Sequence, residues 1–417
     1  MKCIIWLMQI IAALKRYKTA LTENPAPLLW FSVASFLYFM GFSFYFTVFN
    51  LYLSEIGFPQ SVIGTVLSAR SFGSVLMTIP AALIVNKIGY RYNFLTAMGL
   101  AVCVQVLILL TKSVPMLVLL GGLLGTADAL FMIGISPFIM DHTKEEYRNE
   151  LFSLNNALQT FAFAGGSFLT FISGFLGVTD PVALYRGIMW TGVLCASLGM
   201  IIVAFRVHTS LRTSLSNPFT RERLSSLRGF TPLLIVLIVP RTLVGLGASL
   251  IIPFMNLYFK DIFALPGPQI GLIYTFGQLA TAAGMLLVPL VVRRLGKVRT
   301  VVITELFSLP FMFILAKAGS LAYAIPSFLI RQALMNMSTP VSQQFNMEIT
   351  PVHFRTITNG LMSMGDNLSR ALGSLIAGYI IQYRGYSYSF YAAMVLYFIS
   401  AIFYYVFLSP WDRKASS

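Results

Sequence analysis

The feature that most constrains this chain is a succession of apolar blocks, each long enough to cross a lipid bilayer as a helix. A spanning helix needs about 20 apolar residues, and blocks of about that length follow one another along most of the chain. They lack the alternation of barrel strands. The blocks run approximately 28–53, 62–85, 93–111, 115–139, 151–177, 184–205, 231–259, 269–292, 300–318, 321–347, 356–382 and 387–409. The sequence therefore predicts an all-α polytopic membrane protein with 12 transmembrane helices.

Composition excludes the soluble classes. Of the 417 residues, 57% are hydrophobic and only 10% are charged, whereas soluble domains are about 25% charged. The same excess of apolar residues excludes a disordered chain. A membrane protein is the remaining class, with the lipid bilayer as its surroundings.

The net charge of +15 raises the question of nucleic acid binding. With twelve crossings and both termini on one side, most of the 29 Lys and Arg residues fall on that side. This asymmetry is the positive-inside pattern, so the charge predicts orientation and no nucleic-acid partner. We expect a protein of the cell membrane with both termini cytoplasmic. The basic residues on or near the other side are Lys112, Arg186, Lys260, Lys317 and Arg384.

A polar, basic stretch divides the chain into two near-equal halves. The apolar run that begins the chain is about 12 residues long, too short to span, and is typical of an interfacial helix. The predicted organisation is a cytoplasmic N-terminal interfacial segment at 1–27, a six-helix bundle at 28–205, a cytoplasmic linker at 206–230, a second six-helix bundle at 231–409 and a cytoplasmic tail at 410–417.

The two halves repeat each other in sequence. Matching stretches lie at equivalent helix ends, 206 or 207 residues apart, which indicates an internal duplication. Because the spacing is an even number of helices, the repeats run parallel, about an axis along the membrane normal. The matches are Asn50-Leu51-Tyr52-Leu53 with Asn256-Leu257-Tyr258-Phe259, Lys87-Ile88-Gly89 with Arg294-Leu295-Gly296, and Met140-Asp141 with Met347-Glu348.

These features resemble the major facilitator superfamily. The chain shares its two halves of six helices and its basic, glycine-containing loop between helices 2 and 3, repeated between helices 8 and 9. The acid and arginine after helices 4 and 10 are similar to the cytoplasmic gate loops of that superfamily. The resemblance implies secondary transport by alternating access. It assigns the gating role to Lys87, Gly89, Asp141, Arg148, Arg294, Gly296, Glu348 and Arg355.

Charges in the centre of the membrane are the candidate binding site. Each costs about 2.5–3.5 kcal/mol on insertion scales, so we expect these side chains to line a shared wet space between the halves. Four arginines against two aspartates favour a substrate with a carboxylate or phosphate, and a desolvated aspartate is the expected site of proton coupling. The predicted substrate-binding or coupling residues are Arg70, Asp128, Arg241, Arg331, Asp366, Arg370, Gln159 and Gln278.

Local pairing is the alternative for these charges. Asp366 and Arg370 are four residues apart on one helix face, so under this alternative they neutralise each other. The other open pairings are Arg70 with Asp128, Arg331 with Glu305, and Arg241 with backbone carbonyls freed at Pro240.

At the outer face, Glu55 and Asp261 end helices 1 and 7 at matching repeat positions. We expect them to form an outer gate with Lys260 or Lys112, with ordinary solvated helix ends as the alternative.

Other function classes fit the sequence less well. All three histidines fall in predicted loops far from the membrane centre, and phosphate-binding glycine loops are absent. We therefore expect no enzyme, no metal site and no cofactor. The predicted function is secondary active transport of a small organic, amphiphilic solute by proton-coupled efflux, in a monomer. Proton-linked uptake of an organic anion is the alternative, and a channel or lipid scramblase is a more distant one.

Overall fold

The computed structural model describes residues 26–144, 147–207, 231–351 and 354–415, and these ranges are almost entirely helical. The predicted all-α fold class is confirmed. The predicted N-terminal interfacial segment and most of the predicted linker lie outside the described residues.

The N-terminal half contains five long helices. They are α2 (Ala26–Glu55), α3 (Gln60–Leu110), α4 (Val114–Asp141), α5 (Arg148–Ile172), which a short 3-10 turn extends over Ser173–Leu176, and α6 (Pro181–Arg206). The helix α3 covers the predicted second and third spans, because only Gly89 leaves the helical conformation between them. Its φ of +79° lies in the region that glycine adopts without steric cost.

The C-terminal half repeats this plan, with one interruption. Its elements are α8 (Thr231–Ser249), a 3-10 turn η4 (Ile252–Phe254), α9 (Met255–Phe263), α10 (Gly267–Leu295), α11 (Lys297–Lys317), α12 (Leu321–Ile349), α13 (Arg355–Arg384) and α14 (Tyr386–Ala415). The predicted span 231–259 is broken, because Pro253 removes a backbone donor inside η4. At the other end, α14 continues past the predicted boundary at 409, since a helix need not end where its apolar residues do.

Nine helical segments in the described ranges are long and apolar enough to cross a membrane. One of them is α3, which supplies two crossings on either side of Gly89. The helices α12 and α13 have 29 and 30 residues and fall outside the nine because they carry more polar residues. Together these helices provide one for each of the twelve predicted crossings.

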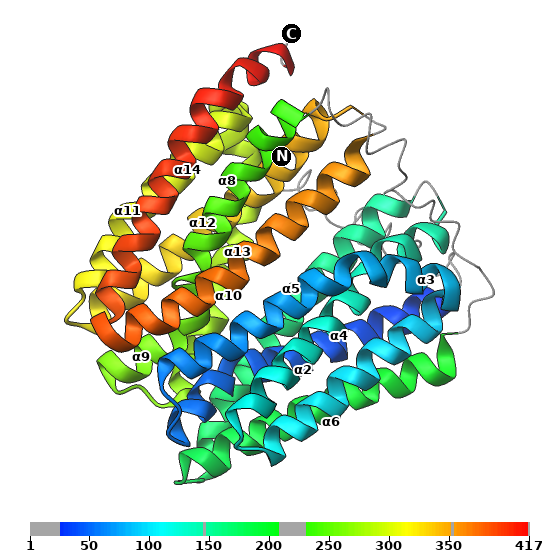
Figure 1. Ribbon diagram of the computed structural model, residues 1–417, viewed down its shortest axis with the longest axis vertical. Helices are drawn as coiled ribbons and strands as arrows, with labels where there is room; N and C mark the ends of the chain where they lie inside the picture. The colour runs from blue at the N-terminus through cyan, green and yellow to red at the C-terminus, as the bar shows by residue number, and fades with distance from the viewer. Residues whose placement is uncertain (1–25, 145–146, 208–230, 352–353, 416–417) are drawn as a thin grey trace, which may run out of the picture.

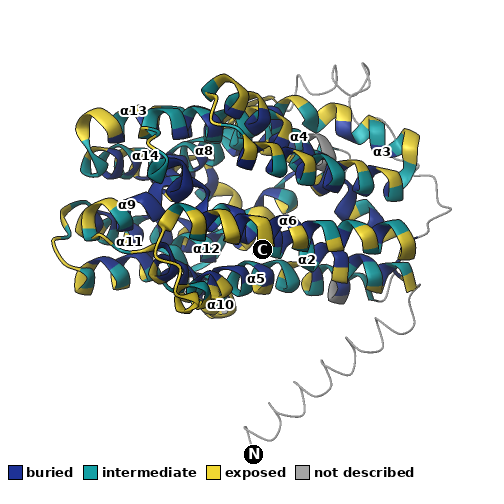
Figure 2. Ribbon diagram, turned by 90° about the horizontal axis from the view of Figure 1, so that it is seen from below, coloured by how far each residue is buried: buried dark blue, intermediate teal, exposed yellow. Residues whose placement is uncertain are grey.

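The outside of the helical body is apolar. Leu286 is 80% exposed, Phe175 76% and Leu76 64%, and exposed residues lie mainly along the outer faces of the helices in Figure 2. So many large apolar side chains facing outward are unusual for a protein surrounded by water. They are the expected surface for contact with lipid, where helices satisfy their own backbone groups.

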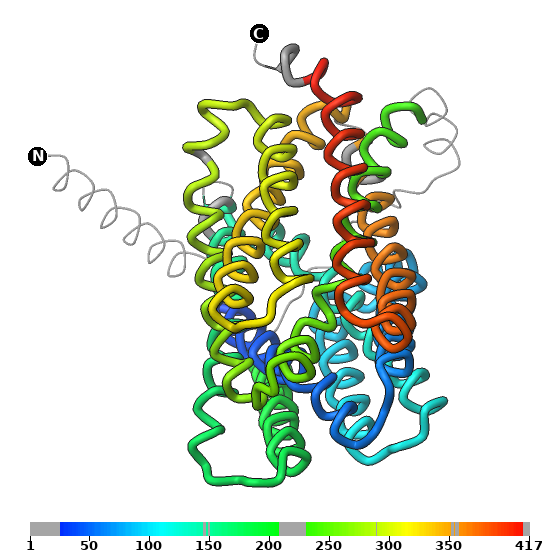
Figure 3. The backbone as a smooth tube through the Cα atoms, turned by 90° about the vertical axis from the view of Figure 1, so that its left-hand side faces the viewer, coloured from blue at the N-terminus to red at the C-terminus, as the bar shows by residue number. Residues whose placement is uncertain are grey.

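Two groups of helices, α2 to α6 and α8 to α14, form the halves (Figures 1 and 3). Their internal packing corresponds: α3 packs on α4 as α11 packs on α12, and α2 packs on α6 as α8 packs on α14. Gly89 and Gly296, which are 207 residues apart, have φ of 79° and 80° and ψ of 169° and 170°. The backbone therefore carries the duplication that the sequence predicted.

The halves meet mainly through two helix pairs, α3 with α13 and α5 with α10. A Cβ on Gly378 would lie 2.5 Å from the carbonyl oxygen of Gln60 and 3.1 Å from the Cα of Gly64. Gly271 is similarly close to the Ser167 carbonyl. These contacts lie at one end of the helices, here called the joined end. From it the halves spread toward the opposite end (Figure 1), called the linker end because α6 ends there, before the predicted linker.

Gly378→Ala tests this close approach. The added methyl group has no space against the Gln60 carbonyl, so we expect a loss of about 1–3 kcal/mol of stability, measured as a lower melting temperature in detergent. Gly187→Ala, in α6, is the matched control, because nothing lies within 4 Å of the Cβ it would carry. Equal melting temperatures for the two variants would contradict the predicted packing.

Candidate functional site

The N-terminal half contains an ion pair near the centre of its helices. Arg70 Nε on α3 lies 2.8 Å from Asp128 Oδ2 on α4, and the side chains are 14% and 21% exposed. The guanidinium also lies over the Phe42 ring, 4.5 Å from its centroid, in a cation–π contact. The two helices approach closely here because Gly125, opposite the Arg70 carbonyl, has no side chain. The pairing of Arg70 with Asp128, one of the alternatives left open by the sequence, is therefore present in the structure.

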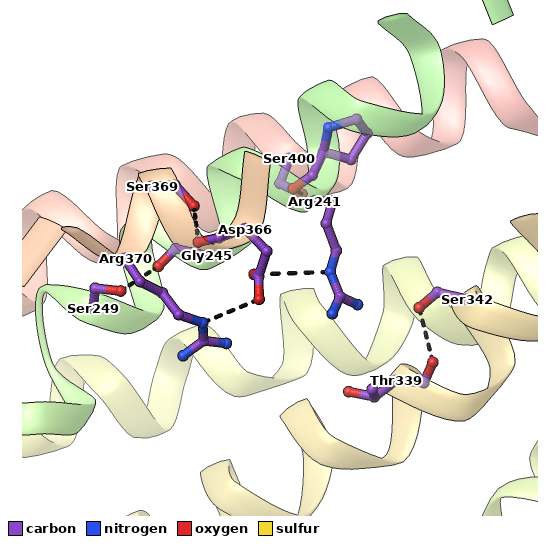
Figure 4. Close-up of polar contacts among 10 residues, drawn as sticks. Arg241, Gly245, Ser249, Thr339, Ser342, Asp366, Ser369, Arg370 and Ser400 are labelled. Carbon is purple, nitrogen blue, oxygen red and sulfur yellow. Dashed lines mark hydrogen bonds and ion pairs between the residues drawn. The ribbon is translucent and has the colours of Figure 1, made fainter. Parts of the chain in front are cut away.

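The C-terminal half holds a cluster of two arginines around one aspartate, here called the Arg–Asp–Arg cluster. Asp366 Oδ1 lies 3.8 Å from Arg241 Nε, and Asp366 Oδ2 lies 3.1 Å from Arg370 Nε. The side chains of Arg241 and Arg370 are 29% and 43% exposed. Figure 4 shows both guanidinium groups extending to the same side as the carboxylate. One carboxylate shared by two guanidinium groups leaves one net positive charge.

Local backbone geometry positions Asp366. A Cβ on Gly245 of α8 would lie 2.8 Å from Asp366 Oδ1, so only glycine lets α8 pass this close to α13. The hydroxyl of Ser369 donates to the Asp366 carbonyl at 2.8 Å. Arg241 binds this carboxylate and not the Pro240 carbonyl, which was the open alternative. The Pro240 carbonyl instead accepts a hydrogen bond from the Ser400 hydroxyl at 3.3 Å.

Arg331 does not join these groups. It is 2% exposed and lies inside the C-terminal half, where its Nη2 donates to the Tyr397 hydroxyl at 3.2 Å. Within the described ranges it forms no ion pair with Glu305, which is 4% exposed. In this conformation Arg331 faces the interior of its own half, and its role in a space shared by the halves stays a prediction. Counting along a helix gives the depth of a residue, but not which neighbouring helix it faces.

The two predicted glutamines lie on helices that meet across the halves. Gln159 is on α5 and Gln278 is on α10, and both are half-buried. The aromatic residues of this region were missed by sequence reasoning. Phe46 lies 6.2 Å from Phe163 and 6.3 Å from Tyr274 between ring centroids, which links both halves. Phenylalanine is too frequent in this chain for the sequence to select these rings.

An ion pair crosses the halves at the joined end. Lys260 Nζ lies 3.0 Å from Glu55 Oε1, so one of the two partners expected for Glu55 is present. Asp261 instead accepts hydrogen bonds from Gln60 Nε2 at 3.3 Å and from the Tyr386 hydroxyl at 2.6 Å. Both predicted acids therefore contact polar partners where the halves meet.

Below this pair, two buried asparagines hold the halves together reciprocally. Asn50 Nδ2 donates to the carbonyl of Pro253, and Asn256 Nδ2 donates to the carbonyl of Thr47 at 3.1 Å. The donors are 206 residues apart, and so are the acceptors, so the two bonds are related by the repeat. We call these four residues the asparagine clamp. The sequence showed the repeated asparagines, but not that they face each other.

At the linker end, the predicted gate acids bind within their own halves. The Tyr90 hydroxyl donates to Asp141 Oδ2 at 2.5 Å, and Lys297 Nζ donates to Glu348 Oε1 at 2.6 Å. Tyr90 and Lys297 are 207 residues apart, as are the two acids. The two halves thus make a hydrogen bond at the same repeat positions, from a tyrosine hydroxyl in one half and from a lysine ammonium in the other.

The other predicted gate residues surround these contacts. Lys87 and Arg294 are exposed, beside the turns at Gly89 and Gly296. Arg148 begins α5 and Arg355 begins α13 at equivalent repeat positions; the Arg355 side chain lies outside the described residues. The gating role expected of these residues stays a prediction for a conformation in which this end closes.

The side chains at the centre of the helices are suited to binding a solute. The central polar groups are guanidinium, carboxylate, amide and hydroxyl groups on helices, suited to holding a charged solute. Within the described ranges, no three His, Cys, Asp or Glu side chains gather into a group that would hold a metal ion.

Comparison with known proteins places the chain in a family. The model of the Major Facilitator Superfamily matches residues 31–242 and 241–417. Similar solved structures include the nucleoside transporter NupG (12% identity, 92% of this chain and 99% of that chain, TM-score 0.73) and a D-xylose-proton symporter (17%, 91% and 97%, 0.72). Another is the human organic anion transporter MFSD10 (15%, 91% and 100%, 0.61). No curated protein sequence matches the chain.

The pair of Arg70 with Asp128 gives a test of mutual dependence. We expect Asp128→Asn to cost about 2–3 kcal/mol of stability, because it leaves a largely buried guanidinium without its carboxylate. The double variant Arg70→Gln, Asp128→Asn is expected to recover most of that loss. Melting temperatures in detergent measure both effects, and a double variant less stable than either single one would contradict the pairing.

Proposed function

The chain belongs to the major facilitator superfamily, and on that premise we propose that it carries a small amphiphilic organic anion across the membrane by alternating access. Members of this family are transporters and not enzymes. The proposal goes further in naming the charge of the solute. The observation that carries it is the Arg–Asp–Arg cluster, where Arg241 and Arg370 share the single carboxylate of Asp366.

The charge balance supports an anion. Arg70 is neutralised by Asp128, and Arg331 is buried inside the C-terminal half. The positive charge that a solute could reach therefore resides on Arg241 and Arg370, whose side chains are also the more exposed ones. An arginine offers a planar fork of donors that matches a carboxylate or phosphate. A solute anion would complete the charge balance of the cluster.

The apolar part of the proposed solute has support from aromatic residues. Phe46, Phe163 and Tyr274 lie edge to face where α2, α5 and α10 meet, and Phe42 packs on Phe163 at 5.4 Å. Such rings supply a large apolar surface at low conformational cost. The sequence favoured an amphiphile first and an anion second, and the proposed solute has both properties. Proton-coupled efflux and proton-linked uptake both stay predictions.

The arrangement of the halves supports alternating access. The asparagine clamp and the Glu55–Lys260 pair tie the halves at the joined end, while the helices spread toward the linker end (Figure 1). With the predicted orientation, this is the inward-facing state. Transport then requires the contacts at the joined end to open while the linker end closes, which is rocking of two repeats around a central site.

Two naphthalene derivatives of nearly equal size test the charge of the solute. We expect 1-naphthoate to raise the melting temperature of the purified protein, because a ligand that binds the folded state stabilises it. We expect 1-naphthylmethylammonium to leave it unchanged. Uptake of labelled 1-naphthoate into proteoliposomes, above that into empty vesicles, is the accompanying transport measurement.

Substitution in the cluster completes this test. Arg370→Gln should raise the 1-naphthoate concentration needed for half-maximal stabilisation at least tenfold. The reason is that losing one charged hydrogen bond of about 1.4 kcal/mol weakens binding by a factor of ten. Arg384→Gln, an exposed arginine on the same helix, is the matched control and should behave as the wild type. Stabilisation by the cation but not the anion would contradict the proposal.

The asparagine clamp gives a test of the mechanism. The double variant Asn50→Ala, Asn256→Ala removes both reciprocal hydrogen bonds, so we expect the joined end to open in a larger fraction of molecules. Distances between spin labels on the two halves at that end should lengthen relative to the wild type. The pair Thr96→Ala, Thr191→Ala is the control, because each of these hydroxyls bonds only within its own helix. Unchanged distances in the asparagine variant would exclude the clamp as a determinant of this state.

A further inference from the structure

The proposed function gives no role to one buried carboxyl group inside the C-terminal half. Glu305 lies near the middle of α11 and is 4% exposed. It forms no ion pair within the described ranges, and its Oε2 has no hydrogen-bond partner there. An ionised carboxylate buried without a partner is among the most costly groups in a protein interior. A residue in this position needs a physical account.

The groups near Glu305 come from three helices. Tyr397 on α14 interacts electrostatically with Glu305, with Arg331 on α12 and with Arg370 on α13. Ser400, also on α14, lies near the Glu305 side chain. Arg331 spends its Nη2 on the Tyr397 hydroxyl, and its Nε has no partner in the described residues. The acid therefore has a hydroxyl group nearby but no direct counter-charge.

We propose that Glu305 is a proton-binding site, separate from the Arg–Asp–Arg cluster, and that the Ser400 hydroxyl transmits its protonation to α8. A hydronium ion gives its proton to a Glu305 carboxylate oxygen and becomes water, so one hydronium O–H bond breaks as the carboxylic O–H bond forms and the side chain becomes neutral. The acid thereby gains a donor, which the carboxylate lacks. The site is assigned by its burial and contacts, whereas the sequence led us to expect coupling at Asp128 or Asp366.

Ser400 acts as a switch because its hydroxyl has a single hydrogen. Its oxygen lies near the Glu305 side chain and 3.3 Å from the Pro240 carbonyl oxygen. With Glu305 ionised, the hydroxyl donates to the carboxylate. With Glu305 protonated, the acid donates to Ser400, and the hydroxyl is free to donate to Pro240, at the 3.3 Å seen here.

The Pro240 carbonyl adjoins the proposed substrate site. The next residue is Arg241, whose side chain binds Asp366. A change in the hydrogen bonding of Pro240 therefore acts on the α8 backbone at the residue that carries one arm of the cluster. The link from Glu305 to transport rests on the proposed function of that cluster, whereas the proton site itself does not.

Infrared titration of the purified protein in lipid vesicles, without any added solute, tests the proton site. We expect the wild type to show a carboxylic-acid C=O band that titrates with pH, and Glu305→Gln to lose it. Asp128→Asn and Asp366→Asn are the matched controls and should retain the band. A band of equal size in Glu305→Gln, or its absence from the wild type, would overturn the assignment.

Ser400→Ala keeps the acid and removes its hydroxyl partner, so it serves if Glu305→Gln does not fold. We expect the same band at a higher frequency, because the C=O group loses a hydrogen bond, and an unchanged frequency would overturn the role of Ser400. Proteoliposomes then separate the two proposals. Glu305→Gln should abolish the pH-gradient dependence of 1-naphthoate uptake and preserve exchange of 1-naphthoate. Failure of wild-type vesicles to take up 1-naphthoate would contradict the proposed function and leave the infrared result standing.

Discussion

The cost of placing charge inside a membrane governs this structure. Each central charge costs several kcal/mol unless it is paired or hydrated, and the fold meets that requirement through close helix contacts. Gly125 brings α4 against α3 at Arg70, and Gly245 brings α8 against α13 at Asp366. Small residues at these crossings are what a bilayer favours, because packing and hydrogen bonds hold helices together where the hydrophobic effect does not.

Duplication explains why the two halves differ at their centres while agreeing at their ends. The ends keep repeat-related contacts, in the asparagine clamp and in the turns at Gly89 and Gly296. The centres do not: Asp366 corresponds to Gln159, and Arg70 corresponds to Gly277. In the proposed mechanism the ends carry out the rocking motion, which needs two similar surfaces, whereas an asymmetric solute needs different side chains on its two sides. The positive surplus accordingly lies in one half only.

The sequence predicted what depends on length and polarity, and missed what depends on direction. Spans, halves and the depth of each charge follow from counting residues along apolar blocks. Arg331 and Arg370 have similar depth, yet one faces α14 and the other lies in the Arg–Asp–Arg cluster, because rotation about the helix axis is set by neighbours distant in sequence. The break at η4 was also missed, although Pro253 is visible in the sequence, because most proline-containing helices here, such as α12, stay continuous.

That break connects the two ends of the proposed mechanism. Pro253 and Asn256 belong to the asparagine clamp, while Arg241 belongs to the cluster, and the chain between them is helical except around η4. Since η4 interrupts the ladder of backbone hydrogen bonds, α9 is able to move with the joined end without carrying the whole of α8 along. Motion of α9 then reaches α8 through a short, deformable segment. Hinges consist of a few residues at an element's end that absorb such a change. In this chain η4 includes the clamp residue Pro253 and separates Asn256 of the clamp from Arg241.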